Sequence, residues 1–356
     1  MDFALDEAQR AIAELTAGAL GHRGASSWKD TWSALASAGL ASLVLPERLG
    51  GDGLGVVAAA IVLTEVGRCA AEVPALATLM LGVLPVVRWG TADQQEQLLS
   101  GVGSGEVLLT AAVREPSGGW PAVPTTVAVR DGADAGTVSG TKVGVPYAAE
   151  AAWILVPASV DSGGRAVVVV EPANAGVTIT PTPTSAGGPE YTVQLDRAAV
   201  AGVLGADAAV ADLYQLAAAG AAAMADGAVA GALALTTAYV ATREQFGRPL
   251  AAFQAVAQQI ADIYITSRTL HLAALAAVWQ LSRCPGPAGD ADVAGYWLAA
   301  QAPAALRACH HLHGGVGMDS SYQLAAFSAL VSDLTRAVGG AEHCLDLLMG
   351  AACSST

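Results

Sequence analysis

The chain has 356 residues, of which 53% are hydrophobic and 13% charged, with a formal net charge of −14. This length predicts two or three domains and leaves ample apolar material, much of it alanine, for a buried core. Nucleic acid and anionic membranes call for a basic face, so an acidic chain is expected to bind neither.

The cysteines and the first residues bear on the cellular compartment. The cysteines are odd in number and scattered, with no C-x-x-C pair, at Cys69, Cys284, Cys309, Cys344 and Cys353. They predict neither a disulfide framework nor a thiolate metal site, which favours a reduced, cytoplasmic setting. Residues 1–15 have the pattern of an acidic amphipathic helix without the basic and apolar regions of a secretion signal, so none is expected.

The first part of the chain, residues 1–107, is predicted to be a helical domain. One apolar stripe, which ends at Gly39, contains Trp28, Trp32, Leu35 and Leu40. A turn-rich connection follows over residues 43–53, and another helix is expected to begin near Val56.

The middle part, residues 108–206, is predicted to be a small β domain. Short apolar or alternating runs alternate there with clusters of Gly, Pro, Asp and Ser. The expected strands are Leu108–Val113, Thr125–Val129, Trp153–Val156, Ala166–Val170 and Tyr191–Leu195.

The last part, residues 207–356, is predicted to be helical again, with a helix-to-helix loop at Cys284–Asp292. The segment Leu213–Val240 is long and apolar enough to resemble a membrane span. Asp226 interrupts it, and its alanines and glycines have little affinity for lipid. We therefore expect a buried helix.

Residues 239–262 carry the most specific motif. A Gly-Arg-Pro break at residues 247–249 is expected to separate two helices. Arg243 offers a planar fork of donors that suits a diphosphate, Gln245 a neutral amide, and Phe246 a flat ring for a base. The residues alone allow two readings: a nucleotide-cofactor site, or a plain helix hairpin in which Arg243 pairs with a surface carboxylate and Phe246 lies in the core.

A second cluster reads His310-His311-Leu312-His313-Gly314-Gly315-Val316-Gly317. Two of its histidines would share a helical face, but no carboxylate accompanies them in sequence, so we expect no metal. Its glycines instead allow a ligand to approach the backbone closely.

The string R-E-Q-F-G-R-P-L followed by F-Q resembles the signature of the acyl-CoA dehydrogenase family, and the run W-x-x-L-A-S-A-G-L from Trp32 and the H-G-G-x-G motif resemble others of its segments. The resemblance implies an α+β fold with an N-terminal helical domain, a middle β domain and a C-terminal four-helix bundle. It also implies FAD, met across a dimer interface. The residues at the corresponding family positions are Arg243, Gln245, Phe246, Gln254, His311, Gly314 and Gly315, with His311 at a position usually held by Gln.

The positions of the family's catalytic base differ here. The family uses a glutamate to remove the proton α to the thioester carbonyl. By the family's spacing, its two alternative positions fall on Val338 and Ala217, neither of which can accept a proton. Other nearby carboxylates, read as solvated helix residues, are Asp212, Asp226, Asp333 and Glu342.

The family's flavin-ring segments are altered as well. Residues 114–119 read R-E-P-S-G-G where the family has a loop with small hydroxyl residues, and residues 143–146 read V-G-V-P where it has a Trp and a hydroxyl residue. The chain thus keeps the elements that reach a neighbour's flavin and loses those that hold its own.

This pattern resembles the non-catalytic partner chain of actinobacterial heterotetrameric acyl-CoA dehydrogenases, which desaturate bulky CoA esters such as steroid side chains. The resemblance implies a catalytic partner chain, an acyl-CoA substrate and electron-transfer flavoprotein as acceptor. Two alternatives stay open: a self-sufficient dehydrogenase with a displaced base such as Glu342 or Asp333, and a structural or binding protein without catalysis.

Overall fold

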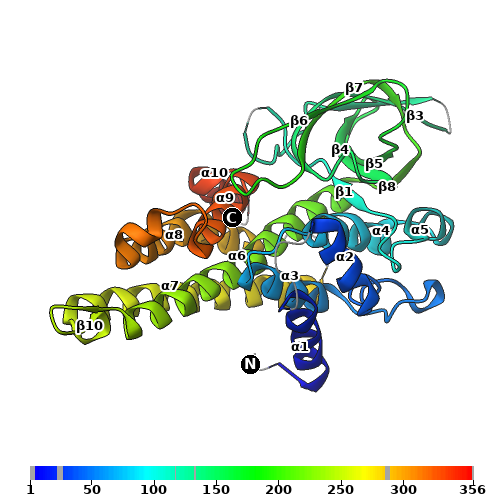
Figure 1. Cartoon of the computed structure of the whole chain (residues 1–356). Helices are drawn as coiled ribbons and strands as arrows, with labels where there is room; N and C mark the ends of the chain where they lie inside the picture. Colours follow the sequence, from blue (N-terminus) through cyan, green and yellow to red (C-terminus); the bar gives the residue numbers. More distant parts are fainter. Residues whose placement is uncertain (1–4, 22–26, 117, 132–133, 285–288, 355–356) are drawn as a thin grey trace.

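The computed structural model describes residues 5–21, 27–116, 118–131, 134–284 and 289–354. Its N-terminal part is helical, as Figure 1 shows. The helices are α1 (Glu7–Gly21), α2 (Trp28–Ser37), α3 (Val56–Arg68), α4 (Leu84–Trp89) and α5 (Ala92–Leu99), with the short helices η1 (Glu47–Leu49) and η2 (Leu76–Val83) between them. A capping box begins helix α2: the Ser27 side chain accepts from the Asp30 backbone N–H, and the Asp30 side chain accepts from the Ser27 backbone N–H.

The middle part is a mostly antiparallel sheet, which Figure 1 shows at one end of the molecule. Its path runs β6-β7-β3-β2-β4-β5-β8, and β1 pairs with β4 in parallel. The strands are β1 (Leu109–Ala111), β2 (Val127–Asp131), β3 (Asp134–Pro146), β4 (Trp153–Val160), β5 (Arg165–Val170), β6 (Val177–Pro181), β7 (Glu190–Ala199) and β8 (Gly202–Gly205). The sheet has its own apolar core, which includes Val138, Ile154 and Val168.

The C-terminal part is helical again, and α9 and α10 lie beside the sheet in Figure 1. Its helices are α6 (Asp207–Thr242), α7 (Gln254–Arg283), α8 (Gly289–His313), α9 (Gln323–Ala337) and α10 (Gly340–Ser354). Shorter elements are β9 (Glu244–Gln245), β10 (Arg248–Pro249), η3 (Leu250–Ala252) and η4 (Gly314–Met318). The expected order of helical, sheet and helical parts is therefore confirmed.

Helix α6 is the central element of the molecule, because its small residues allow neighbouring helices to pack closely against it. A Cβ at Gly227 would overlap backbone atoms of α3, and one at Gly231 would lie 2.7 Å from the Phe327 ring of α9. Only small side chains permit this close helix packing. The helix is long and apolar enough to cross a membrane, but 89% of its most apolar window is buried inside the protein. The expectation of a buried helix is confirmed.

Some details of the sequence prediction were wrong. Strands β3, β6 and β8 were not expected, although β3 pairs along most of its length with β7. The glycines and Lys142 of β3 obscure the alternation of apolar and polar residues that would predict a strand. The strand lies between β2 and β7, which pair with it on either side. The loop expected at Cys284–Asp292 is shorter than predicted, because α8 already begins at Gly289; residues 285–288 lie outside the described part.

Candidate functional site

The motif at residues 243–249 forms a tight hairpin between α6 and α7. The chain leaves α6 at Arg243, and β9 pairs with β10 through Gln245 and Arg248. The two turn residues, Phe246 and Gly247, have φ values of 54° and 77°, the left-handed conformation that two-residue hairpins require. A bulky side chain at positive φ is strained, and such strain often marks a functional site.

The hairpin side chains point outward. Phe246 is 92% exposed and meets Phe253 edge to face, with the ring centroids 6.2 Å apart. Within the part of the chain that the structure describes, the Arg243 side chain has no hydrogen-bond or ion-pair partner. The alternative reading, with Arg243 paired to a carboxylate and Phe246 in the core, is therefore wrong. Figure 1 shows the hairpin at the tip of α6 and α7, far from the sheet.

The His-Gly cluster lies beside this hairpin. Tyr239, one helical turn before Arg243, stacks on His313 at 4.5 Å between ring centroids, and its hydroxyl donates to the His313 carbonyl at 3.4 Å. Two motifs that are about 70 residues apart in sequence thus meet at one end of the helical bundle. All seven residues predicted to contact a cofactor are exposed there: Arg243, Gln245, Phe246, Gln254, His311, Gly314 and Gly315. We call this set the exposed end.

The other two histidines of the cluster have internal roles. His310 lies between the Gly317 carbonyl and the Ser328 hydroxyl, each 2.6 Å from a ring nitrogen. His313 is buried, and its Nδ1 lies 2.9 Å from the Cys309 carbonyl. Burial lowers the pKa of His313, which favours the neutral ring.

The two predicted base positions meet at a second place in the molecule. Ala217 of α6 and Val338, just after α9, both line a cavity of about 540 Å³ between the helical parts and the sheet. Val338 is fully buried and Ala217 is 6% exposed. We call this the domain cavity. Its walls are mostly apolar, as in small-molecule sites.

The carboxylates around the domain cavity are mostly engaged. Both oxygens of Glu190 accept from the Arg336 guanidinium, each at 2.8 Å. Asp333 accepts from the backbone N–H groups of Ser185 and Ala186, at 2.9 and 2.8 Å, and also from Arg336. These contacts stabilise the charged carboxylate and oppose its use as a base.

Glu72, at the rim of the domain cavity, is different. The residue as a whole is exposed, and it has no ion pair among the described residues. Its carboxyl is partly desolvated by the cavity wall, which raises its pKa. Sequence reasoning did not single out Glu72, because it lies in a short irregular segment between α3 and η2 without a motif around it.

The interpretation of the other carboxylates as solvated is wrong for three of four. Asp212 is fully buried and pairs with Arg88 at 2.6 Å, Asp226 is 5% exposed and bonds His271, and Asp333 is engaged as above. Glu342 is exposed, as expected, and does not line the domain cavity. The partners of the buried ones come from distant segments, which a single sequence does not reveal.

The altered loop at residues 114–119 is held by a buried ion pair. Glu115 and Lys142 have fully buried side chains with 2.8 Å between Nζ and Oε1. Lys142 also donates to the Pro157 carbonyl, and the Glu115 carboxylate accepts from Thr125 and Thr126. Burial alone would raise the pKa of Glu115, but hydrogen bonds from Lys142 and Thr125 outweigh it and hold the pKa at about 2.

The side of this loop that faces α10 is filled by His343. A Cβ at Gly119 or at Gly339 would overlap the His343 ring, and the ring nitrogen Nε2 accepts from the Trp120 backbone N–H at 3.0 Å. Burial lowers the pKa of His343. The 114–119 loop, which by resemblance would meet a flavin ring, and the turn after Val338 are thus both in contact with the His343 ring.

Comparison with known proteins agrees with this architecture. The family models for the N-terminal and C-terminal domains of acyl-CoA dehydrogenase match residues 2–106 and 205–351. The chain is 47% identical to Acyl-CoA dehydrogenase FadE28 of Mycobacterium tuberculosis, over 100% of both chains. It is 34% identical to FadE27 of the same organism, over 88% of this chain and 85% of that one.

Solved structures agree as well. The chain superposes on the Tcur3481-Tcur3483 steroid ACAD G363A variant with a TM-score of 0.92 and 32% identity, over 98% of this chain and 99% of the other. It also superposes on a chain of the ChsE4-ChsE5 complex from Mycobacterium tuberculosis with a TM-score of 0.89 and 31% identity, over 100% of this chain and 100% of that chain.

The chain has helical, sheet and helical parts with a cavity where they meet, and family models match both helical parts. It belongs to the acyl-CoA dehydrogenase family, a family of oxidoreductases. FAD is the cofactor of the family, and it supplies the acceptor for hydride from the substrate.

The two halves of a family FAD site fit this chain unequally. At the exposed end, the Arg243 guanidinium has no partner among the described residues, and Phe246 is 92% exposed. These groups suit the diphosphate and a flat base of a dinucleotide held by a neighbour. Beside the 114–119 loop, which by resemblance would meet the flavin ring, His343 fills the space next to Gly119 and Gly339. The exposed end therefore fits part of the cofactor, whereas the region around His343 fits the flavin ring poorly.

Proposed function

We propose that this chain is the non-catalytic subunit of a heteromeric acyl-CoA dehydrogenase and that it completes the FAD site of a catalytic partner chain. One observation carries the proposal: both base positions line the domain cavity, and they hold Ala217 and Val338. The exposed end could bind the FAD of a neighbouring chain, whereas the domain cavity has no carboxylate at either base position. This combination fits a chain that binds part of a neighbour's flavin and has no base of its own.

The reaction is desaturation of a CoA thioester. Bound FAD would supply the acceptor for a hydride from Cβ of the thioester, and a carboxylate of the partner would take the proton from Cα, so that a Cα–Cβ double bond would form. Here the exposed end binds the dinucleotide, and the apolar domain cavity leaves volume beside the partner's site. Electron-transfer flavoprotein is the proposed acceptor, and the proposed setting is cytoplasmic.

The proposed substrate is a bulky CoA ester such as one with a steroid side chain. Two similar structures are a steroid ACAD and the ChsE4-ChsE5 complex, and similarity to them supports both the substrate class and the heteromeric assembly. An apolar residue at the base position suits a subunit without chemistry, since a buried carboxylate without a partner would be costly.

Co-expression with a second family member that has an intact glutamate tests the proposal. The full chain alone is expected to turn over no acyl-CoA, whereas the complex turns over a steroid-type CoA ester with reduction of its flavin. Dehydrogenation by the chain alone at a rate similar to that of the complex would overturn the proposal.

A self-sufficient dehydrogenase with a displaced base is the second candidate. Of the bases expected for it, Asp333 is held by Arg336 and two backbone N–H groups, and Glu342 lies outside the domain cavity. Glu72 is the carboxylate that favours this candidate, because it lies at the cavity rim with a raised pKa and without an ion pair. Substitution of Glu72 separates the two candidates.

A further inference from the structure

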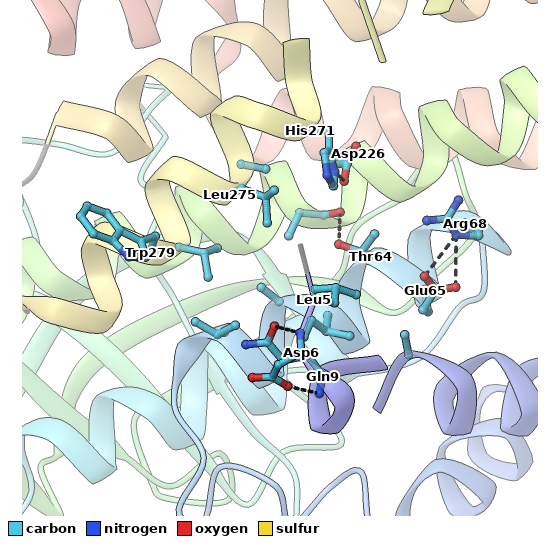
Figure 2. A pocket seen from close by; sticks show the side chains of 17 residues that line it. Leu5, Asp6, Gln9, Thr64, Glu65, Arg68, Asp226, His271, Leu275 and Trp279 are labelled. Carbon is cyan, nitrogen blue, oxygen red and sulfur yellow. Dashed lines mark hydrogen bonds and ion pairs between the residues drawn. The ribbon is translucent and has the colours of Figure 1, made fainter. Parts of the chain in front are cut away.

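A second cavity of about 400 Å³ lies among α1, α3, α6 and α7, and Figure 2 shows it from close by. Among the described residues, it has no lining residue in common with the domain cavity. Its volume lies within the range of roughly 300 to 1,000 Å³ that is typical of small-molecule sites. The two cavities therefore offer separate places for ligands.

The walls of this second cavity are mostly apolar because of small and aliphatic side chains. Ala60 of α3, Ala223 of α6 and Ala274 of α7 leave the space open, and Leu275 and Val278 of α7 close its side. In Figure 2, Leu275 and Trp279 lie on one side of the cavity, and Asp226 lies with His271 at its upper end. A ligand here would bury an apolar body.

The polar feature of the wall is a carboxylate with one oxygen in use. Asp226 is 5% exposed, and its Oδ2 lies 2.8 Å from Nδ1 of His271. A carboxylate only accepts, so Nδ1 of His271 carries the proton in this contact and donates to Oδ2. In the part of the chain that the structure describes, Oδ1 of Asp226 has no hydrogen-bond partner. A buried, partly unpaired carboxylate calls for a donor.

The charges around the cavity select against anions. Glu65 is paired with Arg68 at 3.1 Å and Asp226 with His271 at 2.8 Å, whereas Asp6 has no ion pair among the described residues; Asp6 and Asp226 both present carboxylate oxygens at the cavity wall. Asp6 accepts from the Gln9 backbone at 2.8 Å and lies at the cavity's lower end in Figure 2. A carboxylate ligand would meet repulsion from both residues.

We propose that this cavity binds an apolar molecule that carries a single hydrogen-bond donor, a hydroxyl or an ammonium group, and that Oδ1 of Asp226 accepts from that donor. Among the described residues, the cavity shares no lining residue with the domain cavity or with the exposed end, and the inference does not depend on the proposed heteromeric role. His271 fixes the orientation of the Asp226 carboxylate through its Nδ1–H.

Three probes with the same decyl chain test the chemistry: decanol, decylamine and decanoate. Calorimetric titration of the full chain, with and without a partner chain, is expected to give saturable binding near one site per chain for decanol or decylamine. Binding of the alcohol alone identifies a neutral ligand, and binding of the amine alone identifies a cation. Decanoate is expected to bind at least about tenfold more weakly, since it lacks a donor and is repelled.

Asp226→Asn is the sharpest variant, because an amide still accepts from His271 but presents N–H groups to the cavity. The preference is expected to reverse, with binding of the favoured donor probe weakened about tenfold to hundredfold and decanoate no longer excluded. Asp262→Asn, at an exposed position of α7, is the matched control and should leave the affinities unchanged. Ala274→Leu should abolish binding by filling the cavity.

Three results would overturn the proposal. They are no saturable binding of any probe, equal binding of decanoate to the unaltered chain, and affinities that Asp226→Asn leaves unchanged. If Ala274→Leu fails to fold, the reversal by Asp226→Asn still decides the matter.

Discussion

The exposed end and the domain cavity differ in how their polar groups are satisfied. At the exposed end, Arg243 and Phe246 face solvent, and the backbone at Phe246 is strained to keep the ring there. In the domain cavity, Glu190 and Asp333 are bound by Arg336, and the base positions are apolar. Groups without partners at the exposed end, and mostly engaged carboxylates with apolar base positions in the domain cavity, fit the proposal that a partner chain binds at the exposed end.

The largest expected effect comes from the buried pair that holds the 114–119 loop. Lys142→Met leaves the Glu115 carboxylate buried without its cation, and the free energy of unfolding should fall by about 3 to 5 kcal/mol. Urea unfolding of the full chain measures this loss. Lys29→Met, at an exposed site, serves as the control, and an equal effect of both variants would show that the pair is not specifically required.

The comparison predicts that the exposed end carries the cofactor affinity. Arg243→Ala should weaken FAD binding by the assembled complex about hundredfold, because a bidentate contact to a diphosphate is lost. Flavin retention on dilution and gel filtration measures it. Arg197→Ala, another exposed arginine, provides the matched control. Unchanged retention in Arg243→Ala would remove this residue from the FAD site.

Acid should destabilise the hydrogen-bond network around Glu115. The pKa of Glu115 is about 2 in the folded chain, below its value in the unfolded chain, so its contribution to stability is present above about pH 4.5 and lost as the pH falls toward 2. That contribution is on the order of 2 kcal/mol. Stability curves of the unaltered chain and Glu115→Gln should therefore converge at low pH; parallel curves would contradict this role.

The smallest expected effect tests whether the domain cavity has a hidden base. Glu72→Gln and Asp333→Asn should each change kcat of the complex by less than about twofold, because neither carboxylate takes the proton. Steady-state kinetics on a steroid-type CoA ester measures this. A loss of about a hundredfold or more in Glu72→Gln, with substrate binding unchanged, would favour the self-sufficient candidate.

The fold could be predicted from the sequence further than the site. Apolar periodicity indicates the helices, and the R-E-Q-F-G-R-P-L motif indicates the family, so the order of parts was predicted correctly. Strand β3 was missed because its glycines break the alternation, and its place follows from pairing with β7.

Several polar side chains have partners that lie far away in sequence, and these partners were not predicted. Arg88 reaches Asp212, Arg336 reaches Glu190, and His343 covers Gly119, each across more than 100 residues of sequence. A single sequence contains no local signal for such pairs. That Val338 and Ala217 cannot accept a proton follows from residue identity, whereas their assignment as base positions stays a prediction from the family's spacing.

The measurement that tests the central claim most directly is the FAD content of the purified chain, alone and after co-expression with a partner that has an intact glutamate. The account predicts no bound flavin for the chain alone and one FAD for each pair of unlike chains in the complex, read from flavin absorbance and assembly mass. A yellow assembly of this chain alone, with one FAD for each copy, would contradict it.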